Sequence, residues 1–201
     1  MNIGIIGRAR VGKDTAGKWL VDNRGYRRVA FADALKEAAL KVDPIVNAYV
    51  GFCDEYDHEV TTRHLSTVVR DHGWEGAKEF GIVRCFLQEL GAAVRDIDED
   101  FWLRAAMKKV MGANDDGVPC VITDVRYPNE AASLRRAGFH LVYIERPGVP
   151  QMDHASENSL TADDADFHIW NNGDLGDLLR SADDLWEHVY AVESARSVHV
   201  H

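Results

Sequence analysis

The sequence predicts a three-layer α/β fold with a central parallel β-sheet and a helical insertion, and three observations support this prediction. A short apolar run at residues 2–6 leads into a glycine-containing loop and then into a helical pattern, the order of a βαβ unit. Strand and helix alternate again after residue 120. Between these parts, residues 42–117 show helical spacing rather than strand alternation. We therefore expect one domain over residues 1–201, with 42–118 as the insertion.

Glycine, asparagine and proline residues mark the ends of the expected elements. The expected strands are residues 2–6, 26–31, 120–123, 140–145 and 167–170. The expected helices are residues 14–21, 34–41, 75–80, 83–93, 100–111, 129–137 and 175–192, with an exposed loop at 112–117 and a frayed tail at 194–201.

Composition and charge exclude several kinds of partner. The net charge of −10 repels the phosphate backbone of duplex DNA, so we expect no nucleic-acid polymer as a partner. No stretch is long enough to span a membrane, and the apolar run before Gly7 is too short for a signal peptide. Three cysteines without metal-type spacing are typical of reduced thiols. We therefore expect a cytoplasmic protein without a membrane partner, and a homodimer is one alternative for its oligomeric state.

The most specific motif is the glycine loop between the first strand and the first helix. It matches G-x-x-x-x-G-K, and its residues are Gly7, Arg8, Ala9, Arg10, Val11, Gly12, Lys13, Asp14 and Thr15. Glycines let backbone N–H groups curl around phosphate oxygens, and the N-terminus of the helix adds partial positive charge. Lys13 then reaches the β- and γ-phosphates. A chance match is the alternative, but the flanking strand and helix favour a P-loop that binds ATP.

Asp14 stands where a P-loop usually has Ser or Thr. A carboxylate repels phosphate unless a cation intervenes, so we interpret Asp14 as a ligand of Mg2+. Two alternatives stay open. Asp14 orients the acceptor, or it is only an acidic residue in the first turn of a helix while the hydroxyl of Thr15 binds the metal.

Two further pairs of charged residues stand at the ends of predicted strands. Lys36 follows the second strand, where it can meet an anion, and Asp33 beside it either contacts the substrate or caps the helix. Asp124 and Arg126 follow the next strand of the sheet, at the carboxyl edge where such sheets bind ligands. We expect Asp124 to hold Mg2+ through water and Arg126 to bridge phosphates. The alternative is a structural ion pair, with Asn129 as the cap of the next helix.

These pieces, with several others in the same order, resemble the deoxynucleoside monophosphate kinases of bacteriophages and related bacterial proteins. The matching segments span most of the chain: GRARVGKDT, FADALK, RCFLQELGAAVRDIDEDFW, TDVRYPNEA, ERPGVP, HASE and DFHIWNNGDLGDL. The resemblance implies a nucleoside monophosphate kinase-like fold, ATP and Mg2+ as cofactors, and a reaction of ATP with a dNMP that gives ADP and dNDP. It also implies the host cytoplasm as the location if the protein is phage-encoded.

The resemblance also implies the residues that bind the acceptor. They are Lys36, Arg63, Arg84, Gln88 and Arg95. Arginine forks suit the dianion of a monophosphate, and an amide can pair with a base edge, so Gln88 is the expected base reader. The alternative for Arg84 and Arg95 is a surface position at which they balance nearby acids.

Trp102 and a lid complete the expected site. Trp102 can stack on a base, but a Phe-Trp pair at the start of an amphipathic helix is more often core. Residues 146–160 resemble the lid of the family; there, Arg146 stabilises charge on the transferring phosphoryl group, whereas His154 and Glu157 hold the shape of the loop. The expected catalytic residues are thus Lys13, Asp14, Arg126 and Arg146.

Two other functions fit part of the pattern. A kinase of phosphomevalonate also tolerates Asp after the P-loop lysine, but the RxxLQxLG pattern at residues 84–91 and the long insertion favour a nucleotide acceptor. A regulatory ATPase without a small acceptor is the second alternative, and the lack of an N-K-x-D motif argues against a guanine-specific switch.

Overall fold

The computed structural model describes residues 1–52, 58–149 and 159–198. The chain divides into two compact units. Unit 1 comprises Met1–Phe31 and Leu103–His201, and unit 2 comprises Ala32–Trp102. Each unit has a hydrophobic core of its own. Within the described ranges, no helix combines the length and the apolar character needed to cross a bilayer.

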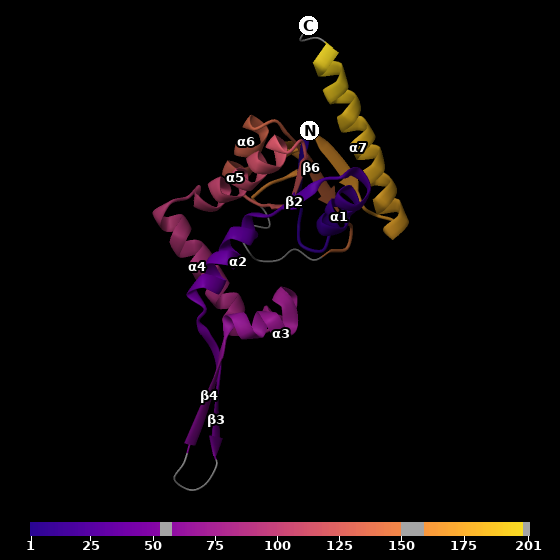
Figure 1. The fold of residues 1–201 in the computed structure, drawn as a ribbon. Coiled ribbons are helices and arrows are strands. Elements are labelled where there is room, and N and C mark those ends of the chain that lie inside the picture. The colour runs from indigo at the N-terminus through magenta and orange to yellow at the C-terminus, as the bar shows by residue number, and fades with distance from the viewer. Residues whose placement is uncertain (53–57, 150–158, 199–201) are drawn as a thin grey trace. The chain divides into compact units, whose positions relative to one another are not determined.

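Five strands of unit 1 form one sheet, and all of their pairings are parallel. In their order across the sheet, the strands are β2 (Arg27–Val29), β5 (Cys120–Val125), β1 (Asn2–Ile6), β6 (Phe139–Glu145) and β7 (Phe167–Trp170) (Figure 1). The predicted central parallel sheet is therefore confirmed. The carboxyl ends of these parallel strands all reach the same edge of the sheet.

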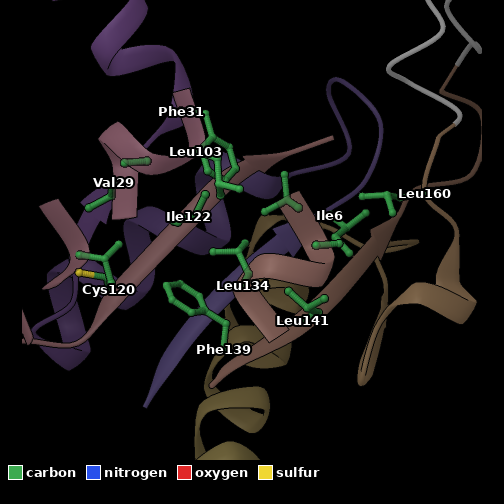
Figure 2. Packing of buried hydrophobic residues seen from close by; sticks show 14 of the residues in the cluster. Ile6, Val29, Phe31, Leu103, Cys120, Ile122, Leu134, Phe139, Leu141 and Leu160 are labelled. Carbon is green, nitrogen blue, oxygen red and sulfur yellow. The ribbon is translucent and has the colours of Figure 1, made fainter. Parts of the chain in front are cut away.

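Helices cover both faces of this sheet and complete the three layers. The helices of unit 1 are α1 (Lys13–Arg24), α5 (Phe101–Asp115, which enters unit 1 at Leu103), α6 (Pro128–Arg136), α7 (Leu175–Val198) and the short 3-10 helix η2 (Ala162–Asp164). On one face, Leu20 of α1 and Leu185 of α7 join Ile5 in one core. On the other face, Leu134 of α6 joins Ile6 in a second core (Figure 2). Successive residues of β1 thus point to opposite faces, as strand geometry requires.

Unit 2 consists of helices and a hairpin. Its elements are α2 (Phe31–Val42), β3 (Ile45–Phe52), β4 (His58–His64), α3 (Leu65–Ala77) and α4 (Gly81–Ile97). Strands β3 and β4 pair as an antiparallel hairpin. Buried apolar residues from these elements, among them Val46, Leu65, Val68 and Val83, form the core of the unit.

The hairpin and the helix that follows it correct the sequence prediction. Much of residues 42–117 lacks strand alternation in the sequence, and the prediction of a helical insertion there included no strand, but the structure has β3 and β4 in this stretch. Within the described residues, β3 and β4 pair only with each other, so no large sheet imposes the alternation that reveals a strand. The signal that remained is the β-branched content, for example Val60, Thr61 and Thr62 in β4. The helix expected at residues 75–80 is instead α3, which ends at Ala77.

Two helices of unit 1 run further than predicted. Residues 112–117 were expected as an exposed loop, but α5 continues to Asp115 because Ala113 is fully buried in the core. Helix α7 continues to Val198, beyond the expected fraying at residue 194. Nε2 of the buried residue His140 lies 2.9 Å from Oε1 of Glu193, and this contact fastens the later turns of α7 to β6.

Candidate active site

The glycine loop connects β1 to α1, and its backbone has a restricted conformation. Gly7, Arg10 and Gly12 have positive φ angles of 144°, 65° and 107°. Such angles favour glycine, and a residue such as Arg10 adopts them rarely. A Cβ atom on Gly7 would clash with the carbonyl oxygen of Ile144, and one on Gly12 would lie 2.7 Å from Cδ2 of Leu178. The shape of the loop therefore requires both glycines.

Lys13 begins α1, and its ammonium group turns back over the loop. The residue is only 8% exposed. Its Nζ donates hydrogen bonds to the carbonyl oxygen of Gly7, at 2.6 Å, and to that of Arg8. A buried ammonium needs acceptors, and these two carbonyl groups supply them. The structure thus brings Lys13 and the start of the loop together.

Asn171, directly after β7, forms a hydrogen bond with the glycine loop. The residue is 4% exposed, and its Nδ2 donates a hydrogen bond to the carbonyl oxygen of Val11 at 2.9 Å. Its main-chain N–H donates to the carbonyl oxygen of Glu145 at 2.7 Å. These contacts tie the ends of β6 and β7 to the loop. An asparagine before Asn-Gly is typical of a turn and gives no sign of a distant partner, so this role of Asn171 could not be read from the sequence.

The remaining loop residues differ in exposure. Val11 is buried in the core, Arg10 is exposed, and Arg8, Ala9 and Thr15 are half-buried.

Asp14, in the first turn of α1, contacts strand β5. Its Oδ1 accepts a hydrogen bond from Oγ1 of Thr123 at 2.8 Å. Thr123 is 2% exposed, whereas Asp14 is exposed. The hydrogen bond from the buried residue Thr123 therefore holds an exposed carboxylate at the end of the glycine loop. Sequence reasoning missed Thr123, because no local pattern indicates a partner 109 positions away.

Asp124 lies on β5 rather than after it. Its Oδ1 accepts a hydrogen bond from the main-chain N–H of Phe31 at 3.1 Å. Phe31 is the first residue of α2, so this carboxylate satisfies one of the backbone donors at the start of that helix. Asp33 lies within the first turn of α2, so its alternative role as the helix cap is wrong.

The turn after β5 is fixed by Glu130. This buried carboxylate accepts hydrogen bonds from the main-chain N–H groups of Arg126, at 2.8 Å, and Tyr127, at 3.1 Å. The side chain of Arg126 is exposed. The expected capping by Asn129 is wrong, because α6 already begins at Pro128 and Glu130 binds the backbone donors instead.

Arg146 directly follows β6 and is exposed. Of the expected lid at residues 146–160, the structure describes only 146–149 and 159–160. His154 and Glu157 lie outside the described residues, so their roles stay predictions.

Helix α4 carries three of the expected acceptor residues on one face. The helix runs from Gly81 to Ile97. At about 3.6 residues per turn, Arg84, Gln88 and Arg95 lie within about 40° of one another around its axis. The predicted helix stopped before Arg95, and the longer helix places this residue in line with the other two. Arg84 and Gln88 are exposed, and Arg95 is half-buried. We refer to these three residues as the α4 face.

The other expected acceptor residues of unit 2 contact neighbouring side chains or backbone. Nη2 of Arg63 lies 2.7 Å from Oδ2 of Asp71, and Nζ of Lys36 lies 5.6 Å from the ring centroid of Trp74. Trp102 is buried, and its Nε1 donates a hydrogen bond to a main-chain carbonyl of α4 at 3.2 Å. The enclosed position of Trp102 is that of a core residue. Roles of these side chains toward an acceptor stay predictions.

Comparisons with known proteins give a family model and viral relatives. A family model described as deoxynucleotide monophosphate kinase matches residues 44–181. A mimivirus protein from Acanthamoeba polyphaga mimivirus, named "Putative deoxynucleotide monophosphate kinase", is 28% identical over 175 residues, which cover 79% of this chain and 81% of that protein. "Uncharacterized protein ORF77" of Ictalurid herpesvirus 1 (strain Auburn) is 39% identical over 82 residues, 38% of this chain and 36% of the viral protein.

Among solved structures, the fold is similar to that of dephospho-CoA kinase from Campylobacter jejuni. The TM-score is 0.51 at 10% sequence identity, and the match covers 94% of this chain and 96% of that one. At this identity the similarity concerns the fold alone. The matched part of the herpesvirus protein is only about a third of its length, whereas the mimivirus match spans most of both chains.

Proposed function

Because the chain belongs to the deoxynucleotide monophosphate kinase family and is a phosphotransferase with a P-loop kinase fold, we propose that it transfers the γ-phosphoryl group of ATP to a deoxynucleoside monophosphate. The products are ADP and a deoxynucleoside diphosphate. The observation that carries this proposal is the glycine loop between β1 and α1. Gly7 and Gly12 have positive φ angles there, and the ammonium of Lys13 donates to the carbonyl oxygen of Gly7. A loop of this kind at a helix N-terminus is suited to nucleotide phosphates.

We assign the binding of ATP to the loop and to the N-terminus of α1. Main-chain N–H groups of residues 7–13 bind the β- and γ-phosphates, and Lys13 exchanges its two carbonyl acceptors for phosphate oxygens. Arg126 and Arg146, both exposed near the carboxyl ends of β5 and β6, are assigned to the charge of the transferring group. Asn171 keeps the loop in position through Val11.

The residues beside the loop suit Mg2+. The carboxylates of Asp14 and Asp124 and the hydroxyl of Thr15 are hard oxygen donors, which this ion prefers. Within the described residues, no three His, Cys, Asp or Glu side chains gather into a metal cluster. A sparse donor set suits Mg2+, which is usually bound through one or two carboxylates together with substrate phosphates. When bound, the ion would supply positive charge that neutralises the phosphate groups of ATP.

The acceptor is assigned to the α4 face. The guanidinium groups of Arg84 and Arg95 can bind the dianion of a monophosphate, and the amide of Gln88 can pair with a base edge. In the reaction, an acceptor phosphate oxygen forms a bond to the γ-phosphorus of ATP while the bond to the β–γ bridging oxygen breaks and ADP leaves. The attacking oxygen carries no proton in the dianion, so the step needs no general base. Because the phosphoryl group passes directly from ATP to the acceptor, no covalent enzyme intermediate forms.

A coupled assay of ADP release tests the proposal directly. The protein is supplied with ATP, Mg2+ and each dNMP or NMP in turn, with mevalonate 5-phosphate as a further acceptor, and the phosphorylated product is quantified. We expect at least one dNMP to stimulate ADP release with stoichiometric dNDP. Slow hydrolysis that no acceptor stimulates would instead indicate a regulatory ATPase. Turnover with mevalonate 5-phosphate alone would move the protein to a different kinase class.

A further inference from the structure

The residue after the P-loop lysine is a carboxylate, Asp14, and it contacts Thr123 on the neighbouring strand. In most P-loop proteins, a hydroxyl follows the lysine and binds the metal, and a carboxylate stands on a neighbouring strand. Here a carboxylate follows Lys13, the hydroxyl of Thr15 comes one position later, and Asp124 keeps a carboxylate on the strand. The residue before Asp124, Thr123, donates a hydrogen bond to Oδ1 of Asp14 at 2.8 Å. We propose that Thr123 is a positioning residue, whose hydroxyl orients the Asp14 carboxylate toward the cation that accompanies ATP. This inference rests on the proposed function.

Both branches of the Thr123 side chain contact α1. A Cβ atom on Gly17 would clash with Cγ2 of Thr123, so the methyl group lies against the helix at Gly17. The hydroxyl reaches Asp14, three residues earlier on the same side of the helix. A β-branched side chain is stiff at χ1, and with its methyl group packed, Thr123 keeps its hydroxyl pointed at the carboxylate. Gly17 is therefore part of the arrangement, because it allows β5 to approach so closely.

The orientation matters because the carboxylate stands beside a phosphate-binding loop. The hydrogen bond from Thr123 to Oδ1 fixes the orientation of the carboxylate, and a cation bound to this carboxylate would remove its repulsion of phosphate. Hydrogen bonds to the ligands of a metal typically change its affinity by about 10–100-fold when they are removed. The plain alternative is that Thr123 only satisfies a buried hydroxyl. The two explanations differ in how nucleotide binding depends on Mg2+.

Calorimetric titration with ATP distinguishes these explanations, with one series in Mg2+ and another in EDTA. The ratio of the two affinities measures the enhancement due to Mg2+. We expect Thr123→Val to lower this enhancement by about tenfold or more, with little change in EDTA, and Thr123→Ser to restore it. A Thr161→Val variant is the matched control, since Thr161 also donates to an aspartate, Asp164, at 3.3 Å. It should keep the enhancement of the unmodified protein.

A second variant separates positioning from plain packing. Asp14→Asn removes the charge but keeps an acceptor for Thr123, and the double variant with Thr123→Val should lose no more enhancement than Asp14→Asn alone, because both act through one carboxylate. If Thr123→Val does not fold, Thr123→Cys takes its place, since a thiol is a weak donor, and an intermediate enhancement is expected.

Unchanged enhancement in Thr123→Val, or additive losses in the double variant, would overturn the inference and leave the proposed function intact. An unmodified protein that binds ATP equally well in Mg2+ and in EDTA would overturn it as well. An unmodified protein that binds no ATP would remove the proposed function and the inference together.

Discussion

The glycine loop of unit 1 and the α4 face of unit 2, the two places proposed for phosphate groups, are built in opposite ways. In the loop, the backbone has a restricted conformation with three positive φ angles. A buried lysine and a buried asparagine, which donates to the carbonyl oxygen of Val11, hold this conformation. On the α4 face, a regular helix presents side chains, and Arg84 and Gln88 are exposed. A site made from backbone tolerates few substitutions, whereas a site made from side chains can change its ligand through single substitutions.

The largest expected effect comes from Lys13→Ala in the loop. Removal of one preorganised donor to a transition-state oxyanion costs about 10²–10³-fold in kcat, and we expect a loss at least that large here. The fold should persist, because the two carbonyl groups that Lys13 binds can be hydrated instead. The measurement is kcat from ADP release, together with the circular dichroism spectrum.

Lys18→Ala is the matched control for Lys13→Ala. Lys18 lies on the same helix, is exposed and pairs with Asp22 at 2.7 Å. We expect kcat within about twofold of the unmodified protein, since exposed pairs contribute little. Equal losses in both variants, or retained turnover in Lys13→Ala, would remove Lys13 from the mechanism.

Gly7→Ala tests whether the backbone shape of the loop is essential. The added Cβ meets the carbonyl oxygen of Ile144 at a φ of 144°, so we expect a loss of about 1–3 kcal/mol in the free energy of unfolding, with weaker ATP binding. Gly25→Ala is the comparison, because Gly25 has a φ of 70° but nothing within 4 Å of an added Cβ. It should cost less and leave ATP binding unchanged. Denaturant titration and nucleotide binding measure both effects, and equal costs would contradict the role of the clash.

Arg84→Ala tests the side-chain site of unit 2. We expect the KM for the dNMP to rise by roughly tenfold, as for the loss of one hydrogen bond to a charged group, while the KM for ATP stays constant. Glu89→Ala, exposed on the same helix, is the control and should leave both constants unchanged. A rise in the KM for ATP alone would place Arg84 outside the acceptor site.

The sequence predicted unit 1 better than unit 2, and the reason is physical. Strands buried on both faces of a parallel sheet, such as β1, are continuous apolar runs that are easily recognised in a sequence. The glycine loop is also visible, because its chemistry restricts residue types at fixed spacing. In unit 2, by contrast, the hairpin of β3 and β4 belongs to no large sheet that would impose alternating apolar and polar residues. The helix that places Arg95 on the α4 face was predicted too short.

The supporting residues of the loop were beyond sequence reasoning for a different reason. Asn171 and Thr123 lie 160 and 109 positions from their partners Val11 and Asp14. No local sequence pattern indicates such contacts, because they exist only after the sheet has formed. The role toward an acceptor that is proposed for Gln88 likewise depends on a ligand rather than on local propensity.

The smallest expected effect concerns the contact between Asp43 and α3 in unit 2, and it depends on pH. Asp43, at a φ of 46° just before β3, accepts hydrogen bonds from Ser66 N–H at 2.7 Å and Ser66 Oγ at 2.9 Å, in the first turn of α3. The backbone hydrogen bond from Ser66, aided by the Ser66 hydroxyl and His64, lowers the pKa of Asp43 below its ordinary value of 3.8, against a smaller opposing effect of burial. A lowered pKa means stabilisation that is present above 3.8 and is lost as pH falls from there through the folded value.

Asp43→Asn isolates this charge, because asparagine tolerates the same backbone conformation and keeps an acceptor. We expect faster hydrogen exchange of the Ser66 amide in the variant than in the unmodified protein at neutral pH, and a difference that shrinks as pH falls below 3.8. Asp22→Asn, which alters only an exposed pair on α1, should leave Ser66 unaffected at every pH. A difference independent of pH would mean that the shape of Asp43, and not its charge, fastens the segment before β3 to α3. In that case unit 2, like the glycine loop, would depend on backbone geometry at this point.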